Sequence, residues 1–177
     1  IYSSIMGVAT LSVAWLAQPF FQSIEIPIFY YGILWGILNI TAGISSYSSY
    51  KYDNKYNIIN ILTVLSILIS ISFMMIYFSP NYFGLIFIFL IYYVRGIVTP
   101  LLKKQININT KSNIRATVMS VRSFILRVSF AIIAPILGYF GDKGINNSFL
   151  LLSILITIFI SISTIKLKQV FLLEKNI

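Results

Sequence analysis

Long apolar runs separated by short polar stretches make up almost all of this chain. Each run is close to the roughly 20 residues that an α-helix needs to cross a ~30 Å hydrocarbon core. The pattern therefore predicts an all-α integral membrane domain that fills residues 1–177. We place its six transmembrane helices at residues 1–21, 28–50, 58–78, 82–102, 117–140 and 148–165.

The composition agrees with a membrane protein. Hydrophobic residues make up 58% of the chain and charged residues 10%, whereas soluble domains have about 45–50% and about 25%. The chain has no cysteine and no histidine, which excludes disulfides, thiolate chemistry, histidine metal sites and imidazole catalysis. Because the chain opens with Ile1 inside an apolar run, we expect it to start within or just before a membrane helix of a longer protein.

Most of the basic residues lie in the stretches between the apolar runs. The net charge of +9 therefore reflects membrane topology, and we expect no nucleic-acid partner. If the second, fourth and final connections share one side of the membrane, Lys143 is the only basic loop residue left for the other side. By the positive-inside rule we expect a multi-pass protein of the inner membrane with a cytoplasmic C-terminus. The cytoplasmic residues would be Lys51, Lys55, Lys103, Lys104, Lys111, Arg115, Lys166, Lys168 and Lys175.

Two arginines lie inside predicted spans, several turns from the nearest polar end. Arg95 and Arg127 both sit roughly 12 Å from the basic ends of their helices, at 1.5 Å per residue. An arginine in hydrocarbon costs about 2.5 kcal/mol or more, so such residues are functional candidates. One alternative is that their side chains snorkel to the headgroups, although this explanation fits Arg122 better than Arg95 or Arg127. Another is that they pair with backbone carbonyls or with carboxylates of a missing partner. Alternatively, they face an aqueous cavity and bind a substrate anion.

Other polar side chains are concentrated in the first, second, fourth and fifth spans, whereas the third and sixth carry only hydroxyls within the membrane. This partition predicts four helices that line an aqueous cavity and two that face lipid. For an amide, a hydrogen bond between helices is the alternative, and the spacing of Gly32 and Gly36 predicts that another helix approaches closely there. The candidate substrate-binding residues beside the arginines are Trp15, Gln18, Asn39, Tyr92 and Tyr93.

The four acidic residues all fall in predicted loops or in the tail. Without a carboxylate in any span, the membrane interior has neither a general acid-base pair nor a metal cluster. We therefore expect no enzyme activity and no cofactor. Proton relays in pumps use Asp, Glu or His within the membrane, so a proton-coupling group would have to lie outside this chain. The acids are Glu25, Asp53, Asp142 and Glu174.

Several segments of the chain resemble the C-terminal half of major facilitator superfamily transporters of bacterial type. The most specific segment is Asn-Ile-Arg-Ala-Thr-Val-Met-Ser at residues 113–120. Residues 95–100, with the order Arg-Gly-x-x-x-Pro, and residues 135–144 add to it, as do Gln18-Pro19-Phe20-Phe21 and the glycines at 32–43. Ser112 and Asn113 are plausible caps for the helix that follows. The resemblance covers nearly the whole chain.

The resemblance implies a transporter with twelve helices, of which this chain holds the seventh to the twelfth. Each half of that fold is a pair of inverted three-helix repeats, and a small solute crosses by alternating access. The implied partner is a missing N-terminal six-helix half, and a proton-driven exporter of a drug or metabolite is the member we favour. The family's G-x-x-x-D-[RK]-x-G motif departs from pattern here, because Tyr47 stands where the acid would follow Gly43. Gly138, Asp142, Lys143 and Gly144 match part of that motif, either as a gating element or as a plain turn.

Two other classes remain open at this point. A six-helix membrane protein that acts in assembly or as a scaffold, without transport, would have the same apolar pattern. An ABC-type permease fits less well, since we see no long cytoplasmic coupling helices. Six further spans encoded upstream, ending in a basic cytoplasmic linker, would distinguish the transporter from the scaffold.

Overall fold

The computed structural model describes residues 2–53 and 57–174, and it describes side chains for residues 2–49 and 57–162. All regular secondary structure in this part of the chain is helical, which confirms the all-α prediction. Six of the helices are long and apolar enough to cross a membrane, as in a multi-pass membrane protein. The elements are α1 (Tyr2–Ser23), the 3₁₀ helix η1 (Ile28–Tyr30), α2 (Tyr31–Asp53), α3 (Ile58–Phe78), α4 (Phe83–Ile108), α5 (Arg115–Asp142) and α6 (Ile145–Glu174).

Several helices extend beyond the apolar spans that were predicted for them. Helix α4 continues to Ile108, so Lys103 and Lys104 lie on its last turns and not in a connector. Helix α1 likewise runs through Pro19 to Ser23. Lysine and glutamine are good helix formers, and membrane helices tolerate proline because neighbouring groups satisfy the freed carbonyl. An apolar run therefore marks where a helix crosses hydrocarbon, but not where its hydrogen bonding ends.

The helix caps differ in part from the prediction. Ser112 and Asn113 do not cap α5: the N-cap residue is Ile114, and it makes no side-chain capping hydrogen bond. Residues 111–114 instead form a turn in which the Ile114 N–H donates to the Lys111 carbonyl oxygen over 3.2 Å. Asn57 does cap α3, because its backbone is extended and its Oδ1 accepts from the Ile59 N–H at 2.9 Å.

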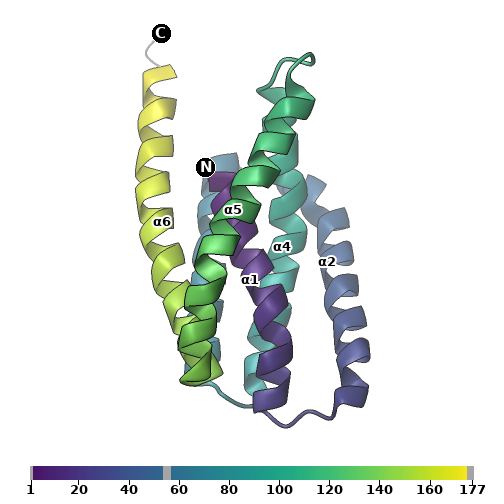
Figure 1. Cartoon of the computed structure of the whole chain (residues 1–177). Helices are drawn as coiled ribbons and strands as arrows, with labels where there is room; N and C mark the ends of the chain where they lie inside the picture. Colours follow the sequence, from purple (N-terminus) through teal and green to yellow (C-terminus); the bar gives the residue numbers. More distant parts are fainter. Residues whose placement is uncertain (1, 54–56, 175–177) are drawn as a thin grey trace.

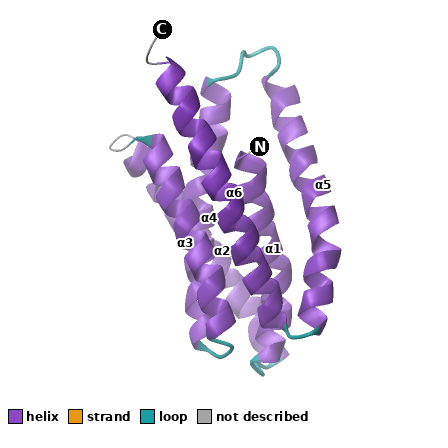
Figure 2. Cartoon of the chain, turned by 90° about the vertical axis from the view of Figure 1, so that its left-hand side faces the viewer, coloured by secondary structure: helices purple, strands orange, loops and turns teal. Residues whose placement is uncertain are grey.

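The helices form a bundle in which α1 and α4 are the most buried, α3 and α6 are intermediate and α2 and α5 are the least buried (Figure 1). Helix α2 packs on α4, and α1 packs on α5. Helix α3 packs on both α4 and α6, and α6 also packs on α1 (Figure 2). This arrangement leaves the outer faces of α2 and α5 without a neighbour in the described part of the chain.

Successive connections lie at alternate ends of the bundle. The N-terminus, the α4–α5 connection and the C-terminus lie at one end, at the top of Figure 1. The α1–α2, α3–α4 and α5–α6 connections lie at the other end. We call the first the basic end, since it carries Lys103, Lys104, Lys111 and Arg115. Lys55 and Lys175 lie outside the described residues, and Lys51, Lys166 and Lys168 lie outside the described side chains.

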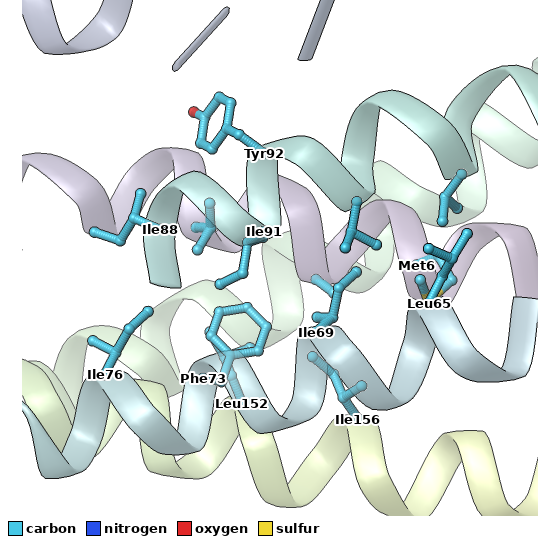
Figure 3. Close-up of a cluster of buried hydrophobic side chains, with 14 of the residues drawn as sticks. Met6, Leu65, Ile69, Phe73, Ile76, Ile88, Ile91, Tyr92, Leu152 and Ile156 are labelled. Atoms are coloured by element: carbon cyan, nitrogen blue, oxygen red, sulfur yellow. The ribbon is translucent and has the colours of Figure 1, made fainter. Parts of the chain in front are cut away.

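A single apolar core joins α1, α3, α4 and α6 (Figure 3). Phe73 of α3 is fully buried, and the rings of Phe20 and Phe149 meet edge to face with centroids 5.7 Å apart. Among their described side chains, α2 and α5 each add one buried apolar residue, Leu38 and Leu137. The core therefore joins four helices, whereas α2 packs mainly on α4, and α5 packs on α1 and α6.

A close approach of α2 to α4 occurs at Gly96 of α4, and not at Gly32 or Gly36 of α2. A Cβ atom on Gly96 would overlap the carbonyl oxygen of Ala42 and the hydroxyl of Ser45. The prediction of a close approach at Gly32 and Gly36 is wrong within the described chain, because a Cβ on either would meet nothing within 4 Å. The reason is the rotation of α2, which turns its Ala42 face towards α4 and its glycines outwards.

Reciprocal hydrogen bonds join α3 to α6. The Ser70 hydroxyl donates to the Ser153 carbonyl oxygen over 3.2 Å, and the Ser153 hydroxyl donates to the Ser70 carbonyl oxygen over 3.1 Å. The hydroxyls of Ser70 and Thr157 lie 2.5 Å apart. Hydroxyls are spread around α3 in the sequence, and only the packing shows that these are the ones turned towards α6.

Candidate functional site

Three of the side chains between α2 and α4 form a compact cluster around Tyr92. The Tyr92 ring is fully buried, and the Trp35 ring meets it edge to face with centroids 6.1 Å apart. The Arg95 carbon Cζ lies 5.3 Å from the Tyr92 ring centroid, within the range of a cation–π interaction. The Tyr92 hydroxyl and the Trp35 Nε1 are buried and make no hydrogen bond of ordinary geometry with another described residue. Tyr92, Arg95 and Trp35 therefore lie together, and their role in binding a substrate stays a prediction.

Arg95 also borders a groove of about 320 Å³ between α2 and α4. Lys103 lies two turns closer to the basic end on the same side. No carboxylate is among the lining residues, so an anion in this groove would meet two positive charges without competition. The other lining residues are Ala42, Gly43, Ser46, Gly96, Thr99 and Pro100.

Arg127 lies in a different place. Its side chain is exposed on α5 and borders an open groove of about 440 Å³ formed by α5 alone. This groove shares no lining residue with the groove beside Arg95. That the two arginines face one common cavity stays a prediction. The residues around Arg127 are Met119, Ser120, Ser123 and Phe124.

The remaining candidate side chains are exposed. Trp15 of α1 is 67% exposed and packs against Phe130 of α5, with ring centroids 6.1 Å apart. Gln18 and Tyr93 are exposed as well. Asn39 donates from Nδ2 to the Trp35 carbonyl oxygen of its own helix over 2.8 Å. This bond within one helix leaves the Asn39 side-chain oxygen available to a ligand or partner.

The α5–α6 connection is a tight turn at the end opposite the basic end (Figure 1). Gly144 has a φ of +127°, which favours glycine, and its N–H donates to the Gly141 carbonyl oxygen over 2.9 Å. The Lys143 Nζ lies 4.3 Å from the Tyr139 ring centroid. Gly138 and Asp142 are exposed beside the turn. The geometry accounts for these residues as a turn, and their gating role stays a prediction.

The sequence did not single out a cavity that Arg122 borders. This pocket of about 670 Å³ lies at the basic end between α1, α3, α4 and α5. The Arg122 Nε donates to the Ser3 hydroxyl, and the Arg122 carbonyl oxygen accepts from the Ser4 hydroxyl at 3.5 Å. These hydrogen bonds join Arg122 of α5 to the first turn of α1. Ser3, which accepts the hydrogen bond, precedes Arg122 by 119 residues in the sequence. No pattern in the sequence links these two residues.

The distribution of charge limits what these sites can do. Of the acids, the side chains of Glu25 and Asp142 are described, and both lie at the end opposite the basic end. In the described chain no three metal-binding side chains come together. The arrangement is thus suited to binding anions near Arg95 or Arg122.

Comparisons with protein-family models, curated proteins and solved structures found no match. The resemblance to a transporter family stays an expectation from the sequence.

Proposed function

We propose that this chain is the C-terminal half of a secondary transporter of the major facilitator type, which moves a small solute by alternating access. The observation that carries the proposal is a partial repeat in the packing of the helices, since α5 also packs on α6 but α2 does not pack to the same extent on α3 in the described chain. The chain divides into two units of three helices, α1–α3 and α4–α6. We match α1 with α4, α2 with α5 and α3 with α6, and call the swap of the matched helices the exchange. Under this exchange the contact of α2 with α4 becomes the contact of α5 with α1. The contact of α3 with α4 likewise becomes that of α6 with α1.

This exchange also preserves the order of burial. It pairs the two most buried helices, α1 with α4, and the two least buried, α2 with α5. Two three-helix units related by an axis in the membrane plane would give this pattern, and such inverted repeats are the building units of this transporter class. The chain direction agrees, since α1 starts at the basic end and α4 starts at the other end.

Individual residues support the same relation. Gly96 lies at the crossing of α4 with α2, and Gly7 lies at the crossing of α1 with α5, where a Cβ would overlap Leu126. Both crossings thus include a glycine, which lies near the start of α1 and past the middle of α4. Ser70 and Ser153 exchange identical hydrogen bonds between α3 and α6, which is the arrangement expected beside a two-fold axis.

The solute we propose is a small anion or a solute with an anionic group. The groove beside Arg95 and Lys103 supports this, because it has two cations and no lining carboxylate. The buried donors of Trp35 and Tyr92 lie next to it. Arg127, Asn39, Gln18 and Trp15 would face the same cavity when a second six-helix half covers α1, α2, α4 and α5.

Orientation and coupling follow from the charges. The basic end would lie in the cytoplasm, together with the C-terminus. The spans carry no carboxylate, so the group that couples transport to protons would lie in the partner half. This chain would then bind the solute and supply moving helices, and the partner half would supply the acid that couples transport to protons.

The test begins with the DNA upstream of the Ile1 codon, which should encode six further spans in frame. The complete protein is then placed in proteoliposomes, and proton movement driven by each member of a panel of small anions is recorded with a pH-sensitive dye. Replacing Arg95 by Ala should lower the solute-driven rate about tenfold or more, as for loss of a charge-assisted hydrogen bond. Arg115→Ala is the matched control, because Arg115 is exposed at the start of α5.

One outcome would refute the proposed transporter, and another would refute the proposed solute site. If no membrane spans are encoded upstream, the chain is not half of a larger transporter and the scaffold class is favoured. If Arg95→Ala transports every active solute at the wild-type rate, the groove between α2 and α4 is not the solute site.

A further inference from the structure

We propose that the pocket around Arg122, here called the Arg122 pocket, binds an acidic phospholipid, with the lipid phosphate on the guanidinium and an acyl chain on the apolar wall. This site is separate from the groove beside Arg95, with which it shares no lining residue. It does not depend on the transport function proposed above. The cavity of about 670 Å³ lies within the range of roughly 300–1,000 Å³ that ligand pockets have.

The pocket has an apolar wall and a polar mouth. Helices α3, α4 and α5 supply the wall, and Gln105 of the last turn of α4 and its C-cap residue Asn109 lie near the basic end. Such a division suits a ligand with a polar head and an apolar tail, and it does not suit a small hydrophilic ion. The wall includes Ile58, Ile59, Leu62, Ile106 and Val121.

Arg122 supplies the charge that the ligand must neutralise. It is partly buried, and its Nε is used by the Ser3 hydroxyl. Among the described residues, no acceptor is bonded to its two terminal nitrogens, and the pocket lining contains no carboxylate. A partly buried guanidinium without a counter-ion is costly, and its two parallel N–H donors match the oxygens of a phosphate.

The depth of Arg122 matches the headgroup region of a bilayer. Arg115 is the first residue of α5, so Arg122 lies about 10 Å further along the helix axis, at 1.5 Å per residue. Lys103 and Lys111 are exposed at the same end, and exposed basic residues mark the interface and attract anionic lipids.

The pocket also borders apolar surface that a lipid tail can follow. Val121 is 50% exposed and Ile125 is 40% exposed, although both line the cavity. Val121 adjoins Arg122 in the sequence, and Ile125 lies about one turn further from the basic end of α5. A free phosphate or a soluble metabolite would leave this wall uncovered, whereas an acyl chain would cover it.

Native mass spectrometry of the complete protein, purified in detergent, tests the proposal. Phosphatidylglycerol and phosphatidylcholine with identical acyl chains are titrated in parallel, and inorganic phosphate is added as a competitor. The wild-type chain should bind phosphatidylglycerol about tenfold more tightly than phosphatidylcholine, as expected for one charge-assisted contact. Inorganic phosphate at millimolar concentration should not displace it.

Three variants locate the binding. Arg122→Gln should lower the affinity for phosphatidylglycerol to the level of phosphatidylcholine, and Arg122→Lys should keep part of the preference. Lys111→Gln is the matched control, because it removes one exposed charge from the same end and should leave the preference intact. Val121→Trp, which fills the cavity but keeps the charge, should lower the affinity for both lipids.

Equal binding of the two lipids by the wild-type chain would overturn the proposal, whatever the variants do. Displacement by inorganic phosphate would also overturn it, since the ligand would then be a free anion. An effect of Lys111→Gln as large as that of Arg122→Gln would show that surface charge alone selects the lipid. None of these outcomes bears on transport.

Discussion

Gly96 of α4 lies directly against the carbonyl oxygen of Ala42 of α2, with no room for a side chain between them. The neighbour is a backbone atom of a regular helix, so it cannot rotate away as a side chain could. Helix α2 has few other buried contacts. The position of α2, and of the groove beside Arg95 that it borders, therefore depends on this crossing.

Replacing Gly96 by Ala should separate α2 from α4 and lower the free energy of unfolding by about 1–3 kcal/mol, the usual cost of overpacking. Gly36→Ala on α2 is the control, since its Cβ would meet nothing within 4 Å. It should raise stability by up to about 1 kcal/mol through helix propensity. Unfolding by sodium dodecyl sulfate in mixed micelles measures both. Equal effects of the two substitutions would mean that α2 does not cross α4 at Gly96.

The contact between the hydroxyls of Ser70 and Thr157 should appear as a coupling energy. Ser70→Ala and Thr157→Ala each break this same contact, so a double-mutant cycle should give a coupling of about 0.6 kcal/mol, with an upper limit of about 1.7 kcal/mol. Ser72→Ala is the control, because the Ser72 hydroxyl donates to the Leu68 carbonyl oxygen of its own helix over 2.7 Å. Its effect should add to that of Thr157→Ala. A Ser70–Thr157 coupling of zero would contradict the packing of α3 on α6.

Two substitutions of Tyr92 should separate its ring from its hydroxyl. Tyr92→Phe keeps the ring between Trp35 and Arg95 and removes a buried hydroxyl, so stability should change by less than about 0.5 kcal/mol. Tyr92→Leu removes the aromatic and cation–π contacts and should cost about 1–2 kcal/mol. The same detergent titration compares them. A loss from Tyr92→Phe as large as that from Tyr92→Leu would show that the hydroxyl has a partner that holds it.

The absence of cysteine from the sequence makes membrane topology directly measurable. Single substitutions Lys111→Cys, Lys168→Cys and Lys143→Cys introduce one thiol each. In intact cells an impermeant maleimide should label only Lys143→Cys, and in inverted vesicles it should label the other two. Labelling of Lys111→Cys and Lys168→Cys from opposite sides would contradict the six-span topology.

The local features of the candidate site could be predicted, but the contacts between helices could not. Tyr92 and Arg95 are three residues apart on one helix, so their proximity follows from helix geometry alone. The partner of Arg122 is Ser3 at the other end of the chain. Similarly, Gly32 and Gly36 have the spacing of a packing motif, yet Gly96, without such spacing, lies at the close approach of α2 to α4.

The sequence by itself determined the class of the protein and its six helices, because the thickness of hydrocarbon prescribes both the length and the apolarity of a spanning segment. Only the tertiary structure decided which face of each helix meets a neighbour. Since lipid tails are as apolar as leucine, helices in a membrane choose partners by close packing and hydrogen bonds. Both depend on how each helix is rotated about its own axis. The packing of Ala42 on Gly96 is one example, and the hydrogen bonds of Ser70 with Ser153 and of Arg122 with Ser3 are two others.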